Sequence, residues 1–319
     1  MSFLSKCSTE TISSASKALV DGRLVAFPTE TVYGLGADAT NPDAIARIYS
    51  TKGRPADHPL IVHIASIDAM GEWAIDIPAY AISLARDFWP GPMTLILNRS
   101  DLAKDFVTGN QNSVGLRIPE HSIALALLQQ FAALGGKGVA APSANRFGAV
   151  SPTTAEDVLE ELGTYLLDGD LILDGGPCTV GVESTIIDCT GEAPRILRPG
   201  AITPEMVKSS TGLDLDESIY TPTIRVSGSL ESHYSPNAKV TLDVEALTGQ
   251  GLIAMAEVET PEGVIRLAAP STIEQYARDL YSALRAADSQ GLTHVVAIEP
   301  KGDGLAAAIR DRLQRAARN

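Results

Sequence analysis

The sequence predicts an α/β protein of two domains joined by a linker. Short runs rich in β-branched residues alternate with stretches of helical periodicity through residues 1–209. A polar segment punctuated by Gly and Pro follows at 210–237, and the alternation then resumes to residue 319. With 319 residues, 45% of them hydrophobic, the chain is long enough to bury a core in each of two domains.

The first region alternates expected strands with expected helices. Apolar, β-branched runs predict strands at 23–27, 59–64, 94–97, 114–118, 138–141, 171–174, 184–189 and 195–198. Apolar residues at helical spacing predict helices at 8–21, 42–51, 78–88, 121–134 and 154–162. The last of these opens with Ser and Thr caps and acidic first-turn residues, as stable helix N-termini do.

The segment 210–237 has the composition of a linker, being polar, acidic and interrupted by Gly and Pro. After it, the strand-like runs KVTLDV, GVIRLA and THVVAIE alternate with helices expected at 271–287 and 303–317. This pattern predicts a small second α/β domain at 238–319.

Bulk composition narrows the possible functions. A formal charge of −14 argues against non-specific coating of nucleic acid, because Lys and Arg on phosphates supply most of that affinity. Cys7, Cys178 and Cys189 are far apart, so neither a disulfide framework nor a zinc site is expected. The sequence has no apolar run of membrane-spanning length and no signal peptide, and we expect a cytoplasmic protein with no membrane partner.

The stretch AFPTETVYGLGADAT contains Gly34-x-Gly36-x-x-Ala39, which looks like a dinucleotide-binding fingerprint. In a true fingerprint the glycine turn follows its strand at once. Here six residues separate Phe27, where the strand is expected to end, from Gly34. A dinucleotide site is therefore not expected, and the glycines are interpreted as tight turns that allow close backbone approach. No phosphate-binding P-loop motif is present either.

Lys52 with Arg54, and separately Arg117, are candidates to bind an anionic ligand. Lys52 and Arg54 flank a glycine, and together they could clamp a polyphosphate, although this motif alone favours a solvated basic turn, because surface Lys and Arg are common. Arg117 lies in an apolar strand, where an unpaired charge is costly to bury. Its partner is expected to be either an internal carboxylate or a bound ligand.

Polar residues also gather after two later strands. Ser143, Asn145 and Ser151 lie in a loop between a strand and a helix, where ligands of α/β proteins often bind. Arg195 and Arg198 are three apart on one strand and so point to opposite faces, and we favour Arg198 for the site. Motifs of serine hydrolases and zinc proteases are absent from the sequence.

In this order, the segments FPTETVYGLG, KGRP, HPLIVHI, FWPGPMTLIL, VGLRIP, APSAN, SPTTAEDV, GVESTI and LRPG resemble the YrdC-type threonylcarbamoyl-AMP synthase family. The segment SGSLESHYSP followed by a small domain resembles its two-domain form, with a C-terminal Rossmann-like domain. The resemblance implies a YrdC-like twisted mixed sheet with flanking helices at 1–209. It also implies that linker 210–237 folds over the active site.

The resemblance further implies a reaction. L-threonine, bicarbonate and ATP, with Mg²⁺ on the nucleotide, would give threonylcarbamoyl-AMP and pyrophosphate. Downstream transferase proteins would then modify the adenosine beside the anticodon of tRNAs that read codons beginning with A. Because Mg²⁺ prefers phosphate oxygens and water, no dedicated metal site in the protein is expected.

Residue roles follow from the same resemblance. Catalytic roles are implied for Lys52, Arg54, Ser143 and Asn145. ATP contacts are implied for Arg54, His58, Ser113, Asn145, Ser151, Arg198 and Tyr234, and threonine contacts for Thr31, His63, Arg117, Ser143 and Ser184. Tyr234, in the motif His233-Tyr234-Ser235-Pro236, would close the nucleotide pocket. Thr29 and Glu30 are further candidates for the threonine site, and Tyr33 is expected to serve packing.

Three alternatives stay open. A carbamoyl-transfer enzyme of hydrogenase maturation uses a related domain, but it would carry an acylphosphatase-like domain and zinc-finger cysteines. A double-stranded-RNA-binding module conflicts with the net charge of −14, and no stable nucleic-acid binding is expected. A nucleotide-binding protein without catalysis would bind ATP and show no threonine-dependent turnover.

Overall fold

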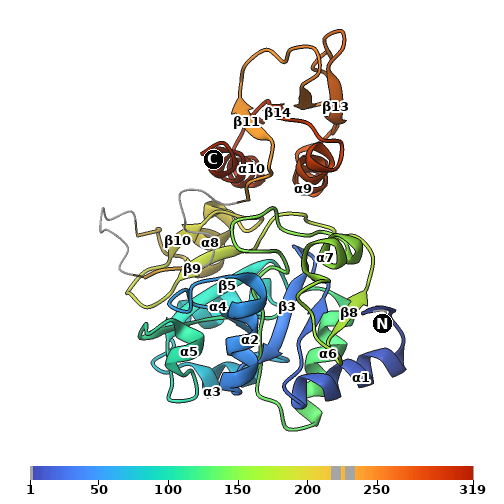
Figure 1. Cartoon of the computed structure of the whole chain (residues 1–319). Coiled ribbons are helices and arrows are strands. Elements are labelled where there is room, and N and C mark those ends of the chain that lie inside the picture. The colour runs from blue at the N-terminus through green and yellow to red at the C-terminus, as the bar shows by residue number, and fades with distance from the viewer. Residues whose placement is uncertain (1–2, 217–223, 227–233, 319) are drawn as a thin grey trace.

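The computed structural model describes residues 3–216, 224–226 and 234–318, and these build two β-sheets with helices (Figure 1). The larger sheet has ten strands in the order β1-β8-β2-β3-β7-β4-β6-β5-β9-β10 and mixes parallel with antiparallel pairs. The smaller sheet has four parallel strands. This is the mixed α/β architecture expected from the sequence. No described helix is both long and apolar enough to span a bilayer.

The strands of the large sheet are short and mostly buried. They are β1 (Leu4–Lys6), β2 (Val25–Phe27), β3 (Gly34–Asp38), β4 (Ile61–His63), β5 (Met93–Asn98), β6 (Ser113–Arg117), β7 (Val139–Ala140), β8 (Leu171–Asp174), β9 (Thr185–Asp188) and β10 (Arg195–Arg198). The helices around them are α1 (Thr9–Val20), α2 (Pro42–Lys52), α3 (Met70–Trp73), α4 (Ala79–Phe88), α5 (Asp105–Thr108), α6 (Ser122–Ala133), α7 (Ala155–Leu162) and α8 (Pro204–Thr211).

Every expected strand and helix of this region is present, with ends that differ by two residues or fewer. The sequence did not predict β1, β3, α3, α5 or α8. Helix α7 begins as expected, because the hydroxyl of Thr154 and the carboxylate of Asp157 cap each other's backbone N–H groups.

The glycines of GLGAD lie in a strand, so the prediction of a tight turn is wrong. Strand β3 pairs antiparallel with β2, and Gly36 lies opposite Val25. A Cβ atom on Gly36 would come within 2.8 Å of the side chains of Phe27 and Val139. The expected close approach is therefore correct: glycine lets side chains of β2 and β7 cross the backbone of β3.

Helices cover both faces of the large sheet. Helices α1 and α6 pack together against one face, and Leu19, Leu127 and Phe131 join Phe27 of β2 in that layer. Helices α2 and α4 contribute to the main core on the other face, with Ile48 and Leu84 fully buried. The free cysteines Cys178 and Cys189 are buried hydrophobes, as expected, and Cys7 is partly buried.

The smaller sheet forms a second unit, which we call the C-terminal unit. Its strands are β11 (Lys239–Leu242), β12 (Gly251–Ile253), β13 (Ile265–Ala268) and β14 (His294–Ala297), in the order β11-β14-β12-β13. Its helices are α9 (Ile273–Ser289) and α10 (Leu305–Ala316), and both lie on the side of this sheet that faces the larger sheet (Figure 1). Only the short strand β12 was not expected.

Candidate active site

One buried pocket gathers most of the polar residues that the sequence singled out. It opens where the loops after β2 and β7 meet the ends of β4, β6 and β10. The lining residues are Thr29, Val32, Gly34, Arg54, Ile61, His63, Arg117, Ala141, Pro142, Ser143, Glu183, Ser184, Arg198 and Tyr234. Because β3, β7, β4 and β6 are neighbours in the sheet, residues far apart in the chain meet here.

Three arginines make the pocket a site for anions. Arg54 follows α2, Arg117 ends β6 and Arg198 ends β10, and all three are less than 10% exposed. Burial lowers the pKa of Arg54 to about 10 and also lowers the pKa of Arg198, yet both stay cationic at neutral pH. Three guanidinium groups around one cavity are suited to bind phosphate and carboxylate oxygens.

The partner of Arg117 is an internal carboxylate. Its guanidinium contacts Glu30 Oε1 at 2.7 Å and donates a hydrogen bond to Thr31 Oγ1 at 2.9 Å. Thr31 also hydrogen-bonds the hydroxyl of Thr29, which lines the pocket. Thr31 itself lies behind the wall. A direct threonine contact of Thr31 stays a prediction, and in this structure its hydroxyl supports Arg117.

Ser184 and Arg198 both line the pocket and are joined by hydrogen bonds. Arg198 donates hydrogen bonds to the carbonyl oxygen of Ser184 at 2.9 Å and to its hydroxyl at 3.1 Å. The same hydroxyl lies 2.8 Å from Thr94 Oγ1. Arg198 lines the pocket, whereas Arg195 pairs with Asp216 outside it, so the two arginines point to different sides as strand alternation predicted.

His63 lines the pocket as a neutral side chain. Its ring meets Phe27 edge to face, and it is almost fully buried. Burial, followed by the charge of Arg117, lowers its pKa to about 3. Among the described residues, its buried Nδ1 atom has no hydrogen-bond partner. A neutral imidazole with an unused nitrogen can hydrogen-bond a substrate.

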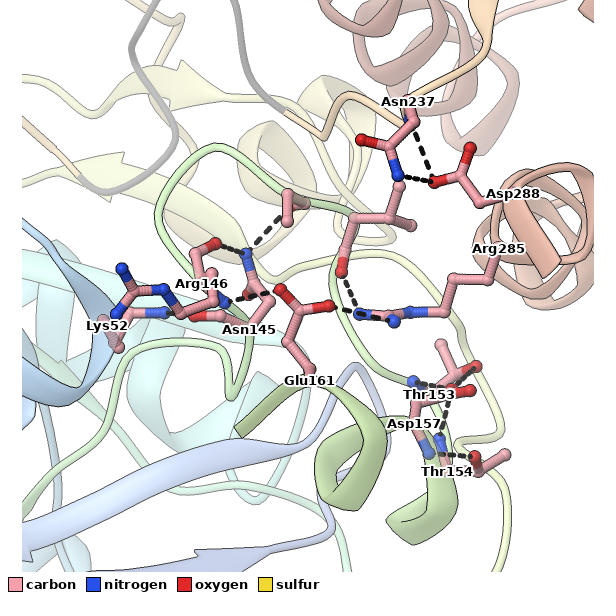
Figure 2. Close-up of polar contacts among 12 residues, drawn as sticks. Lys52, Asn145, Arg146, Thr153, Thr154, Asp157, Glu161, Asn237, Arg285 and Asp288 are labelled. Carbon is pink, nitrogen blue, oxygen red and sulfur yellow. Dashed lines mark hydrogen bonds and ion pairs between the residues drawn. The ribbon is translucent and has the colours of Figure 1, made fainter. Parts of the chain in front are cut away.

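Lys52 and Asn145 lie behind the pocket wall, against the loop after β7 (Figure 2). Lys52 Nζ donates to the carbonyl oxygen of Ser143 at 2.6 Å and to that of Asn145. Asn145 Nδ2 donates to the carbonyl oxygens of Arg146 and Ala149 at 2.7 and 2.8 Å. Burial, then Arg54, lowers the pKa of Lys52. These two side chains shape the loop that presents Ser143, and their contact with a substrate stays a prediction.

Besides Asn145, three predicted ATP residues do not line this pocket. His58 packs edge to face on Phe147. Ser113 lines an adjoining cavity with Gln111 and Arg225, and this cavity shares Ile61 with the main pocket. The hydroxyl of Ser151 donates to Glu183 Oε1 at 2.7 Å and so lies one layer behind the wall.

Glu183 is the site residue to which the sequence assigned no role. Its buried carboxylate lines the pocket and accepts hydrogen bonds from Ser151, from Tyr281 of α9 at 2.8 Å and from Arg312 of α10 at 3.0 Å. Burial alone would raise its pKa, but Arg312 and Arg198 together with these hydrogen bonds lower it to about 2. The motif GVESTI marked Glu183, whereas nothing in the sequence connected it to Tyr281 or Arg312.

Tyr234, which precedes the C-terminal unit, also lines the pocket. Its ring stacks on Tyr281 with centroids 5.6 Å apart, and the Arg312 guanidinium lies 5.5 Å from its centroid. His233, which precedes it in the motif, lies outside the described residues. Tyr234 therefore occupies the place expected of a lid residue, and its movement stays a prediction.

Comparisons with known proteins agree with this geometry. A family profile described as "Telomere recombination" (Sua5–YciO–YrdC) matches residues 17–200, and one described as "Threonylcarbamoyl-AMP synthase, C-terminal domain" matches residues 202–318. The threonylcarbamoyl-AMP synthase of Pyrococcus abyssi is 39% identical and that of Bacillus subtilis 37% identical. These alignments cover 93% and 96% of this chain, and 91% and 92% of the relatives.

A solved structure gives the same result. P. abyssi Sua5 complexed with L-threonine is 36% identical and superposes with a TM-score of 0.87, covering 98% of this chain and 96% of its own. The match spans both sheets. The chain therefore belongs to the Sua5–YciO–YrdC family, in the form that carries the threonylcarbamoyl-AMP synthase C-terminal domain.

Proposed function

We propose that this chain is an L-threonylcarbamoyladenylate synthase, which converts L-threonine, bicarbonate and ATP to threonylcarbamoyl-AMP and pyrophosphate. The observation that carries the proposal is the buried pocket with Arg54, Arg117 and Arg198 on its walls. Relatives of that name align over more than 90% of their length, and one structural neighbour is described as bound to L-threonine.

The pocket suits this chemistry. The amine of threonine adds to bicarbonate with loss of water and gives a carbamate. A carbamate oxygen then attacks the α-phosphorus of ATP, and pyrophosphate leaves. Such a step needs positioning and charge stabilisation more than a nucleophilic side chain. Three cationic side chains supply the charge stabilisation.

We assign the two substrates to different arginines of the pocket. Arg54 and Arg198 would bind the triphosphate of ATP. Arg117 would bind the threonine carboxylate, since it retains pocket exposure while Glu30 holds it from behind. Neutral His63, Ser143 and Ser184 offer hydrogen bonds to the hydroxyl and amine of threonine.

The remaining assignments concern residues that do not line the pocket. Lys52 would reach a phosphate only after leaving the two carbonyl oxygens that it now binds. His58, Ser113, Asn145 and Ser151 would contact ATP only after a comparable rearrangement. We also propose that residues 1–209 form the catalytic domain, 210–237 the linker over the active site and 238–319 the second domain.

Magnesium would enter with the nucleotide. No cluster of three or more metal-ligating side chains is found among the described residues. We propose that the cation is held by phosphate oxygens and water, where it would neutralise charge on the triphosphate. Transfer of the product to tRNA by partner proteins and a cytoplasmic location complete the proposal.

Pyrophosphate release tests the reaction directly. The purified chain is given ATP and Mg²⁺ with threonine and bicarbonate, and each of these two is then omitted in turn. Release that requires both is expected. Robust release without threonine would refute the reaction, and ATP binding without release would leave a nucleotide-binding protein.

A further inference from the structure

Side chains of the C-terminal unit contact the pocket-lining residue Glu183. Arg312 of α10 and Tyr281 of α9 bond to Oε2 of Glu183, while Ser151 bonds to Oε1. Arg312 and Tyr281 are fully buried, whereas Glu183 is 6% exposed and lines the pocket. The carboxylate is therefore held almost entirely from behind.

Glu183 has an unfavourable charge for this place. It lies on the wall of a pocket that also contains Arg198, and Arg198 is one of the charges that act on it. A carboxylate there would repel a phosphate and compete with it for the guanidinium of Arg198. Because both groups are buried, solvent screens this competition weakly.

Arg312 supplies the counter-charge. Its Nε atom donates to Glu183 at 3.0 Å, and its second ion-pair partner is Asp311, which also pairs with Arg315. Asp311 thus keeps a cation if Arg312 is removed. Glu183 would keep only Arg198, the cation that a phosphate needs.

We propose, on the basis of the synthase function above, that Arg312 and Tyr281 are positioning residues of the active site. They hold and neutralise the Glu183 carboxylate so that Arg198 remains available to the triphosphate of ATP. The C-terminal unit thereby contributes to ATP affinity without touching the nucleotide.

The test compares Arg312→Met alone with Arg312→Met in a Glu183→Gln background. In the single variant, KM for ATP is expected to rise roughly 10-fold or more, because a buried carboxylate loses its partner. KM for threonine should stay within about 2-fold. In the double variant, KM for ATP should return to within about 3-fold of the wild-type value, since the unpaired charge is gone.

The matched control is Arg310→Met on the same helix. Arg310 bonds to the carbonyl oxygens of Pro300 and Gly302 inside the C-terminal unit, so its loss perturbs α10 without reaching Glu183. It should leave KM for ATP unchanged. An Arg312→Met variant with unchanged KM for ATP, or a double variant as impaired as the single one, would overturn the inference.

A milder variant covers the case in which Arg312→Met does not fold. Tyr281→Phe removes one hydroxyl donor and should raise KM for ATP about 2- to 10-fold. The same change in the Glu183→Gln background should have a smaller effect, and an equal effect in both backgrounds would contradict the proposal. If the wild-type chain shows no threonine-dependent pyrophosphate release, the synthase function fails instead, so the two failures are distinguishable.

Discussion

Two buried arginine–carboxylate pairs flank the pocket, and they have opposite polarity. In the pair Arg117–Glu30 the cation faces the pocket and the carboxylate lies behind it. In the pair Arg312–Glu183 the carboxylate faces the pocket and the cation lies behind it. The first pair can bind an anion directly through Arg117. In the second pair, Arg312 can only neutralise the Glu183 carboxylate, so that this carboxylate does not repel the anion.

The pairs also differ in where their members come from. Arg117 and Glu30 both belong to the large-sheet region, on β6 and on the loop after β2. Arg312 belongs to α10 and reaches across to a loop before β9. The first wall is therefore complete within one unit, whereas the second requires the C-terminal unit to be in place.

Lys52 belongs to neither pair, and its loss is expected to have the largest effect and to affect both substrates. Lys52→Met removes the ammonium group that ties the carbonyl oxygens of Ser143 and Asn145. We expect kcat/KM to fall roughly 100-fold or more for both substrates, because charge or loop position at the reacting groups is lost. Steady-state pyrophosphate release measures this. Near-wild-type turnover would show that Lys52 contributes nothing beyond packing.

The Arg117–Glu30 pair is best tested by removing both charges at once. Arg117→Met combined with Glu30→Gln avoids an unpaired buried carboxylate. KM for threonine should rise roughly 10- to 100-fold, which is the loss of affinity expected when a hydrogen bond to a charged group is removed. KM for ATP should change little. The single Glu30→Gln variant is the control, since it keeps the guanidinium. An equal rise in both KM values would contradict the assignment of Arg117 to threonine.

Arg285 offers a second contact between the units with a smaller expected effect (Figure 2). It pairs with Glu161 of α7 at 3.3 Å and donates to the carbonyl oxygen of Val150. Because this ion pair is partly exposed, Arg285→Met should raise KM for ATP by no more than about 3-fold. An effect as large as that of Arg312→Met would show that the C-terminal unit acts through the loop at Val150 and not through Glu183.

His63 gives a prediction for stability against pH. Its pKa is about 3 in the folded chain and 6.5 in its ordinary state, so the unfolded chain binds a proton first as pH falls. Above pH 6.5, His63 is neutral in both states and does not change the free energy of unfolding. Between about pH 6.5 and pH 3, protonation of the unfolded chain lowers the free energy of unfolding progressively. His63→Gln should flatten the unfolding free energy across this window, as measured by urea denaturation. A slope unchanged by the substitution would mean that His63 is not buried as a neutral group.

The sequence predicted most helices and strands because the spacing of apolar residues along the chain is a local property. The strand at 195–198 followed from its apolar pattern, and strand alternation showed that Arg195 and Arg198 point to opposite faces. Arg198 was favoured because it lies just before Pro199-Gly200, and it lines the pocket. Strand β3 was missed because Gly34–Asp38 contains no β-branched residue and two glycines. Those glycines are explained only by Phe27 and Val139 on neighbouring strands, which no local pattern reveals.

The pairing of charges could not be predicted in the same way. Arg117 clearly needed an anion, yet Glu30 lies far from it in the chain and is brought close only by the sheet order. Tyr281 and Arg312 are 98 and 129 residues from Glu183. Their roles depend on how α9 and α10 meet the large-sheet region, which is a matter of tertiary packing and not of sequence period.

One crossed measurement tests this account most directly. KM values for threonine and for ATP are determined in parallel for the Arg117→Met/Glu30→Gln and Arg312→Met variants, with Arg310→Met as the control. The account predicts a crossed pattern: the first variant raises KM for threonine alone, and the second raises KM for ATP alone. If both variants raise both KM values by the same factor, the two walls have no separate roles, and the opposite polarity of the pairs has no functional meaning.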